Sequence, residues 1–248
     1  MTYKKCENKN IFADNSTVDV QFEGNEVLLI KQKKWTTKEL ETQVAAFHYT
    51  GEKLPIDPDV EKARLPPFAL AFYKYIFFKS RLPDETELWE YYVNRHFTTI
   101  DDEHIQTGIR GTLKTFATTS VKARLLRSYP SLVRDFHFYV LCLTSGQFER
   151  VSYSLRQDYF EGIDLCVHYS GFEFHVSILL NSQRARTYKN QKYGRHTEMP
   201  KNEVVMLFDL TQFGQVKKKI KLFSSNHVEI LIEELKRRIG SCNFEVPE

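Results

Sequence analysis

The sequence lacks the features that mark several large classes of protein. No apolar run approaches the roughly 18 to 20 residues that a membrane-spanning helix requires. The first ten residues, MTYKKCENKN, carry two lysines with no apolar stretch behind them, which is not the pattern of a secretion signal. Internal repeats and low-complexity tracts are also missing. We therefore expect a soluble, cytoplasmic protein with no membrane partner.

Cysteine is scarce and scattered. The four cysteines form no CxxC pair, which argues against a zinc ribbon, a thioredoxin-like motif or a disulfide framework; they are Cys6, Cys142, Cys166 and Cys242. Cys142 and Cys166 sit inside apolar runs, where a buried reduced thiol is the usual explanation.

The short motifs of several enzyme classes are missing as well. The chain has no GxxxxGK[ST], GxGxxG, HExxH or GxSxG. Their absence argues against a P-loop NTPase, a Rossmann dehydrogenase, a zincin protease and an α/β-hydrolase. No organic cofactor is expected.

The composition is that of an ordinary globular protein. Hydrophobic residues make up 42% and charged residues 27% of 248 residues, enough for one large domain or two modest ones. The net charge of +3 neither demands nor excludes nucleic acid, so the local distribution of charge matters more. Two stretches are basic: 181–196, with five basic side chains and no acid, and 217–221, with four lysines. Each stretch fits a solvated face as well as it fits a binding surface.

The N-terminal region predicts a hairpin followed by helices. Alternation over 18–22, a Gly24-Asn25 turn and an apolar 27–30 indicate the hairpin. Helices are expected over 38–47, 66–80 and 85–96, and the last two are strongly aromatic. We place a boundary near 98–102, which divides the chain into an accessory region, 1–100, and a core, 101–248.

The core region predicts a mixed α/β fold. We expect helical stretches over 104–127, and Pro130 in the first turn of a buried helix that ends near Thr144. Strands are expected over 163–169 and 172–180, joined by a tight Ser170-Gly171 turn, and a basic helix over 182–192. The continuous apolar run 204–210 predicts a central strand, followed by a short strand, 220–223, and an amphipathic helix, 226–239.

The segment EGIDLCVHYSGFEFHVSILL is the most informative part of the chain. If its turn centres on Ser170-Gly171, paired residue numbers sum to about 341, and side chains alternate between two faces. One face is then apolar, and the other carries four potential metal ligands: Asp164, His168, Glu173 and His175. A hairpin that simply exposes one face to solvent gives the same alternation, so this pattern alone does not require a site.

The element order and the D-x8-E-x-H pattern resemble the PD-(D/E)XK nuclease superfamily, which includes restriction endonucleases, phage exonucleases, RecB-like nucleases and transposon-end nucleases. The resemblance covers roughly 104–239. It implies a restriction-endonuclease-like core, in which a central mixed sheet is flanked by helices. It also implies hydrolysis of phosphodiester bonds by a metal ion, Mg²⁺ or Mn²⁺, that lowers the pKa of an attacking water.

Carried over residue by residue, the resemblance assigns Asp164 and Glu173 as metal ligands and His175 as the third catalytic residue, in the position of the motif Lys. The following basic segment would contact the phosphate backbone of nucleic acid through five side chains: Arg184, Arg186, Lys189, Lys192 and Arg195.

The sequence departs from the family pattern at two positions. Ile163 stands where the motif has Pro, and His175 replaces Lys with a side chain that is not permanently charged. Asp158, together with Glu161, is an alternative first acid, and Asp135 on the preceding helix is a further candidate ligand. His137, on the same helix, fits a satisfied core histidine better than a ligand.

Three functions follow from these features. The first is a metal-dependent DNA endonuclease of a restriction, defence or mobile-element system. The alternative is a catalytically inactive nuclease-like module that binds nucleic acid or a protein partner. A third is a structural protein in which the aromatic helices form an oligomer interface, and a homodimer or a partner subunit is compatible with all three.

Overall fold

The computed structural model describes residues 18–22, 26–30, 35–47, 49–51, 55–109, 111–153, 157–158, 162–181, 202–217 and 219–242. Its helices are α1 (Thr37–Ala46), α2 (Pro58–Lys62), α3 (Phe68–Lys79), α4 (Glu85–His96), α5 (Thr118–Thr144) and α7 (Ser225–Cys242). Its strands are β1 (Val18–Phe22), β2 (Glu26–Ile30), β3 (Thr98–Thr99), β4 (His104–Ile109), β5 (Thr112–Ala117), β6 (Arg150–Ser152), β7 (Leu165–Tyr169), β8 (Phe172–Leu180), β9 (Glu203–Phe208), β10 (Gln215–Lys217) and β11 (Ile220–Leu222). The fold is therefore mixed α+β, with several small sheets.

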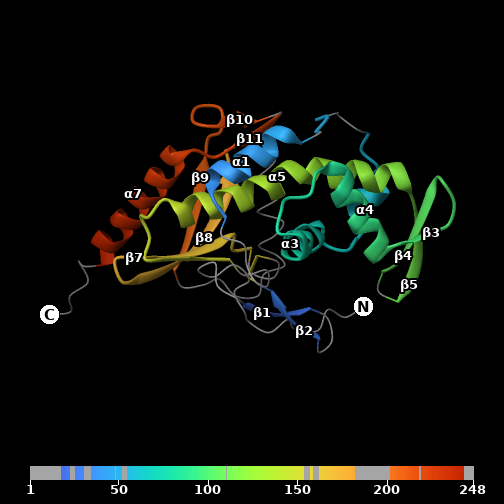
Figure 1. Ribbon diagram of the computed structural model, residues 1–248, viewed down its shortest axis with the longest axis horizontal. Coiled ribbons are helices and arrows are strands. Elements are labelled where there is room, and N and C mark those ends of the chain that lie inside the picture. Colours follow the sequence, from blue (N-terminus) through green and yellow to red (C-terminus); the bar gives the residue numbers. More distant parts are fainter. Residues whose placement is uncertain are drawn as a thin grey trace.

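The long helix α5 organises the molecule. It runs along the long axis, with the sheet β6–β9 and α7 toward one end and α3, α4 and the strands β3–β5 toward the other (Figure 1). Helices α1 to α4 all pack against it, as do β5, β6, β11 and α7. Eleven of its side chains are buried, and together they form the centre of the hydrophobic core.

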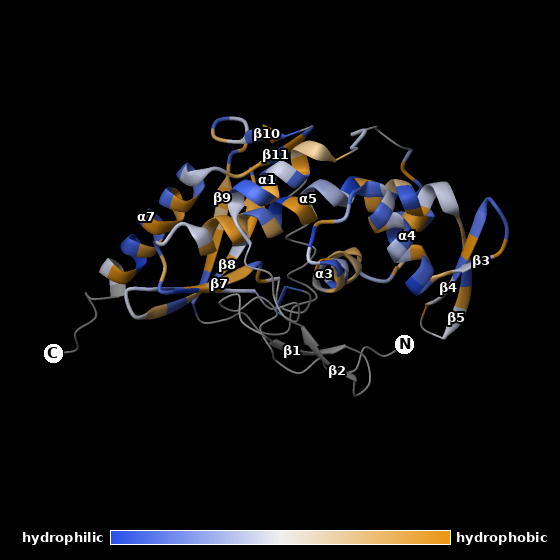
Figure 2. Cartoon of the chain, viewed as in Figure 1, coloured by the Kyte–Doolittle hydropathy of each residue, from blue (hydrophilic) through white to orange (hydrophobic). Residues whose placement is uncertain are grey.

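The largest sheet has the strand order β6-β7-β8-β9. The first three strands form an antiparallel meander, whereas β9 pairs with β8 in parallel. A parallel neighbour requires the chain to cross back over the sheet between β8 and β9. Helix α7 then packs against β9, and Figure 2 shows the alternation of apolar and polar residues along it that such one-sided packing requires.

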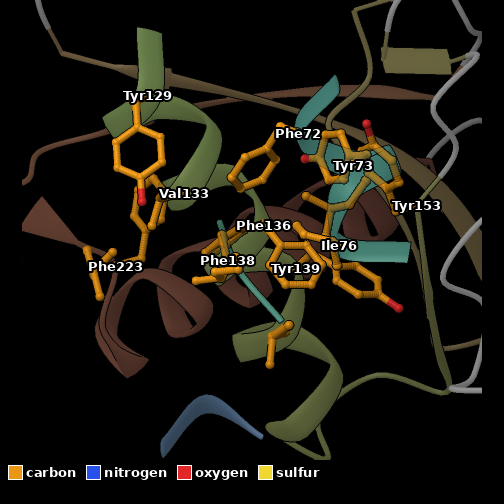
Figure 3. Packing of buried hydrophobic residues seen from close by; sticks show 14 of the residues in the cluster. Phe72, Tyr73, Ile76, Tyr129, Val133, Phe136, Phe138, Tyr139, Tyr153 and Phe223 are labelled. Carbon is orange, nitrogen blue, oxygen red and sulfur yellow. The ribbon is translucent and has the colours of Figure 1, made fainter. Parts of the chain in front are cut away.

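The aromatic residues of the N-terminal helices belong to the core. Phe72 and Tyr73 of α3 and Tyr92 of α4 are almost completely buried. Tyr73 packs against Phe136 of α5, with ring centroids 6.2 Å apart, and stacks on Tyr153, which follows β6, at 4.3 Å (Figure 3). These rings therefore hold α3 against α5 and the edge of the sheet.

Three predictions about the elements are wrong. The stretch expected to be helical from His104 forms the hairpin β4–β5, because Thr and Ile favour extended backbone and Gly111 supplies the turn with φ of +80°. Pro130 lies inside α5, not in its first turn, since the helix already begins at Thr118.

The third correction concerns β9. Its apolar run predicted a central strand, but within the described part of the chain β9 is the edge of the four-stranded sheet. Val205 and Leu207 on one of its faces are 39% and 44% exposed, whereas Val204, Met206 and Phe208 on the other face are buried. The continuous apolar run predicted that both faces of β9 are buried. In the described structure only one of the two faces is buried.

The remaining element predictions agree closely with the structure, including the two hairpins at 18–30 and 165–180, the helices α1, α3, α4 and α7, and the end of α5 at Thr144. The predicted basic helix over 182–192 lies outside the described residues. None of the described helices combines the length and apolar character that crossing a membrane would require.

Candidate functional site: the polar face of the β7–β8 hairpin

The turn of the β7–β8 hairpin fixes its register. Ser170 and Gly171 both adopt left-handed backbone, with φ of +51° and +79°, as a two-residue type I′ turn requires. Cys166 pairs with His175 and His168 pairs with Glu173, so paired numbers sum to 341 as predicted. The register prediction from the sequence is confirmed.

The two faces of the sheet differ in chemistry. The side of Leu165, Val167 and Val176 is buried. The pairings continue the other face onto β6, where Arg150 meets His168, and onto β9, where Glu203 meets His175. This polar face carries the following side chains: Arg150, Ser152, Cys166, His168, Glu173, His175, Ser177 and Glu203.

Four side chains of the polar face form a contact network. The Glu173 carboxylate lies 2.8 Å from Nε2 of His168 and 3.6 Å from Nε2 of His175. The other ring nitrogen of His175, Nδ1, lies 3.1 Å from Sγ of Cys166. Glu173 is half exposed, and exposure falls along the network to 5% at Cys166. The network therefore runs from the surface to a nearly buried thiol.

Asp164 lies at the opposite end of the hairpin from Glu173. Its backbone N–H donates to the carbonyl of Val176 at 2.9 Å, and its carboxylate accepts from the N–H of Ile178 at 2.5 Å. The Asp164 carboxylate thus accepts a hydrogen bond from a strand N–H that would normally bind a backbone carbonyl of the neighbouring strand. Glu173 pairs with His168, which lies four residues after Asp164 in the chain. The Cα atoms of Asp164 and Glu173 are therefore about 13 Å apart along the strand direction.

This separation bears on the metal ion implied by the resemblance. A single Mg²⁺ binds its oxygen ligands at about 2 Å, and Asp164 and Glu173 do not converge on one point. Across the described residues, no group of three or more His, Cys, Asp or Glu side chains is arranged to hold a metal ion. The predicted pair therefore does not fit one shared ion.

The alternative acids lie near a pair of buried tyrosines. The hydroxyl of Tyr153 donates to the carboxylate of Asp158 at 2.7 Å, and Tyr153 stacks on Tyr73. Burial raises the pKa of Tyr73 well above its usual value, and the negative charges of Asp158, Asp135 and Asp164 raise it further. Three carboxylates from different parts of the chain thus act on one buried ring. Glu161 lies outside the described residues.

The structure describes lysines of the second basic stretch, 217–221, but none of the predicted phosphate-binding residues of the first, 181–196. All five predicted phosphate-binding residues, Arg184, Arg186, Lys189, Lys192 and Arg195, lie outside the described residues. In the second basic stretch, Lys217 pairs with Glu41 at 3.6 Å and Nζ of Lys219 donates to the carbonyl of Thr50. These two lysines therefore attach the β10–β11 hairpin to neighbouring parts of the protein.

Sequence reasoning placed Cys166 opposite His175 but interpreted it only as a buried thiol. It missed Tyr73 and Tyr153 as partners of the acids, because Tyr73 comes from a helix some eighty positions earlier in the chain. The spacing of Cys166, Glu173 and His175 within one alternating hairpin was the available signal for their contact.

No family model, curated protein or solved structure matches this sequence.

Proposed function

We propose that this chain carries a nuclease-like core of the PD-(D/E)XK kind and that this core binds DNA. The topology supports the proposal: a long helix, α5, is followed by the antiparallel strands β6, β7 and β8, then by the parallel strand β9 and by α7. The resemblance implies a helix, a β-meander, a helix and a further strand. The described residues contain the first helix, the meander and the further strand, and the parallel β8–β9 pair is the single observation that carries the proposal.

The crossover between β8 and β9 is the proposed DNA-binding segment. It must return the chain from the end of β8 at Leu180 to the start of β9 at Glu203. Its sequence from 181 to 196 has five basic side chains and no acid. Basic side chains supply most of the contacts that proteins make to the phosphate backbone.

Binding is proposed ahead of cleavage because of the position of Glu173. A nuclease of this kind needs both motif acids at one metal ion, and the hairpin register separates Asp164 from Glu173. His168 and His175 instead engage Glu173. DNA binding does not depend on that pair.

The proposal is tested with the triple variant Arg184→Ala, Arg186→Ala, Lys189→Ala. We expect a weaker affinity for duplex DNA and a salt dependence of log K that is shallower by about 1 for each lost phosphate contact. The measurement is a fluorescence anisotropy titration at several salt concentrations.

The matched control removes the same charge elsewhere, through Lys38→Ala, Lys79→Ala and Lys236→Ala, which are exposed positions on α1, α3 and α7. The control variant should bind like the wild type. Equal weakening of both variants would mean that net charge alone drives binding, and absence of binding by the wild type would overturn the proposal.

Cleavage is the second candidate, and Asp164 favours it. This acid directly precedes β7, next to the position that the resemblance assigns to the first motif acid, and its charge, with those of Asp135 and Asp158, acts on Tyr73. We expect any nicking of supercoiled DNA in Mg²⁺ or Mn²⁺ to be lost in Asp164→Asn, which keeps an acceptor for the Ile178 N–H and removes only the charge. Exposed Asp102→Asn is the control, and nicking that survives in Asp164→Asn would reject this site.

A further inference from the structure

Cys166 has the surroundings of a reactive thiol. Its Sγ lies 3.1 Å from Nδ1 of His175, and the thiol can also donate to the side-chain oxygen Oε1 of Gln157 at 3.4 Å. The other nitrogen of His175, Nε2, lies 3.6 Å from the carboxylate of Glu173. A thiol, an imidazole and a carboxylate therefore lie in sequence, the arrangement in which an imidazole takes the proton of a thiol and a carboxylate stabilises the resulting imidazolium.

Cys142 provides an internal comparison. It lies on α5, is 1% exposed, and burial in apolar surroundings raises its pKa well above the usual value. Cys166 is 5% exposed and has a polar face around it. The chain thus contains one thiol whose surroundings oppose ionisation and one with a base in contact.

We propose that Cys166 is a site of oxidation by small hydroperoxides, with His175 as its proton partner. The thiolate sulfur attacks one oxygen of the peroxide, so that an S–O bond forms as the O–O bond breaks. The departing hydroxide, or the alkoxide of an organic hydroperoxide, takes the proton held on Nδ1 of His175 and leaves as water or as the alcohol. Cys166 is oxidised by two electrons to sulfenic acid and the peroxide is reduced.

Glu173 is the positioning residue of this site. It contacts His175 through one carboxylate oxygen and His168 through the other. His168 lies on the same polar face and, at 2.8 Å from this carboxylate, helps to hold Glu173 in place. His104, whose Nδ1 contacts Asp101 outside this sheet, supplies the control for replacing a histidine.

The test treats the native full-length chain with hydrogen peroxide at neutral pH, traps sulfenic acid with dimedone, and measures each cysteine by peptide mass spectrometry. We expect Cys166 to be labelled at least ~10-fold faster than Cys142, since an unassisted thiol is only a few per cent thiolate at neutral pH. In urea-unfolded protein the two rates should become equal.

Two variants separate the role of His175 from simple exposure. His175→Gln should slow labelling of Cys166 toward the Cys142 rate, whereas His104→Gln should leave it unchanged, with folding of both checked by circular dichroism. Equal labelling of Cys166 and Cys142 in native wild type would overturn the proposal, and so would an unchanged Cys166 rate in folded His175→Gln. If His175→Gln does not fold, the native and unfolded wild-type rates alone decide.

Discussion

At the scale of single residues, one electrostatic contact outside the polar face joins α1, α5 and β10. His137 of α5 is completely buried, and its Nε2 lies 3.4 Å from Glu41 of α1. Lys217 of β10 approaches the same carboxylate at 3.6 Å. His137 is thus buried in the core, as the sequence suggested, but it is not fully satisfied, because its Nδ1 has no hydrogen-bond partner among the described residues.

This contact predicts an acid-dependent loss of stability. The hydrogen bond from His137 lowers the pKa of Glu41, burial opposes that shift, and the charges of His137 and Lys217 add to the lowering. A carboxyl group with a lowered pKa in the folded state stabilises the protein above its unfolded pKa and loses that contribution as the pH falls through the folded value. Glu41→Gln should therefore reduce the free energy of unfolding by about 1 to 2 kcal/mol at neutral pH.

Urea unfolding measured at about pH 7 and about pH 3 checks this, because a model carboxyl group titrates near pH 4. The difference between wild type and Glu41→Gln should shrink at the lower pH. Glu90, exposed on α4, is the control: Glu90→Gln should have little effect at either pH. A difference that stays constant or grows toward low pH would contradict the assignment of Glu41 as charged in the folded state.

At the scale of elements, patterns within a short stretch of chain were sufficient for prediction. The alternation on either side of Ser170-Gly171 determined the register of the β7–β8 hairpin, because the period of a strand leaves one way to separate its apolar and polar side chains. For the same reason, the sequence predicted correctly that Cys166 and His175 pair across the two strands.

Elements that depend on distant partners were predicted less well. Pro130 usually marks a helix start, but packing of eleven buried side chains holds α5 together on both sides of it. The edge position of β9 depends on which strands pair, and its apolar run contains no information on that. The proximity of Asp135, Asp158 and Asp164 to Tyr73 likewise depends on how α3 packs against α5 and the sheet.

At the scale of the whole molecule, the core does not stop at the boundary predicted near residue 100. One hydrophobic cluster extends from Trp35 through the helices and the main sheet to Leu235. Within it, Trp35 meets Phe136 edge-on, with ring centroids 5.1 Å apart. Phe138, two residues further along α5, packs on Phe208 of β9 and Phe223 after β11, with ring centroids 5.2 and 4.9 Å apart. The two-part division remains a prediction, and unfolding can test it.

Both tryptophans, Trp35 and Trp89, lie in the N-terminal part, so their fluorescence reports the unfolding of that part and, through Trp35, of its contact with Phe136. Phe138→Ala removes a buried ring from the other part and should cost about 3 to 5 kcal/mol. Because the core is continuous, we expect the urea midpoint measured by tryptophan fluorescence to fall together with the midpoint measured by circular dichroism. Phe172→Ala, at a position 46% exposed, should leave both midpoints nearly unchanged. A tryptophan transition that stays at its wild-type midpoint in Phe138→Ala would instead establish two independently folding parts.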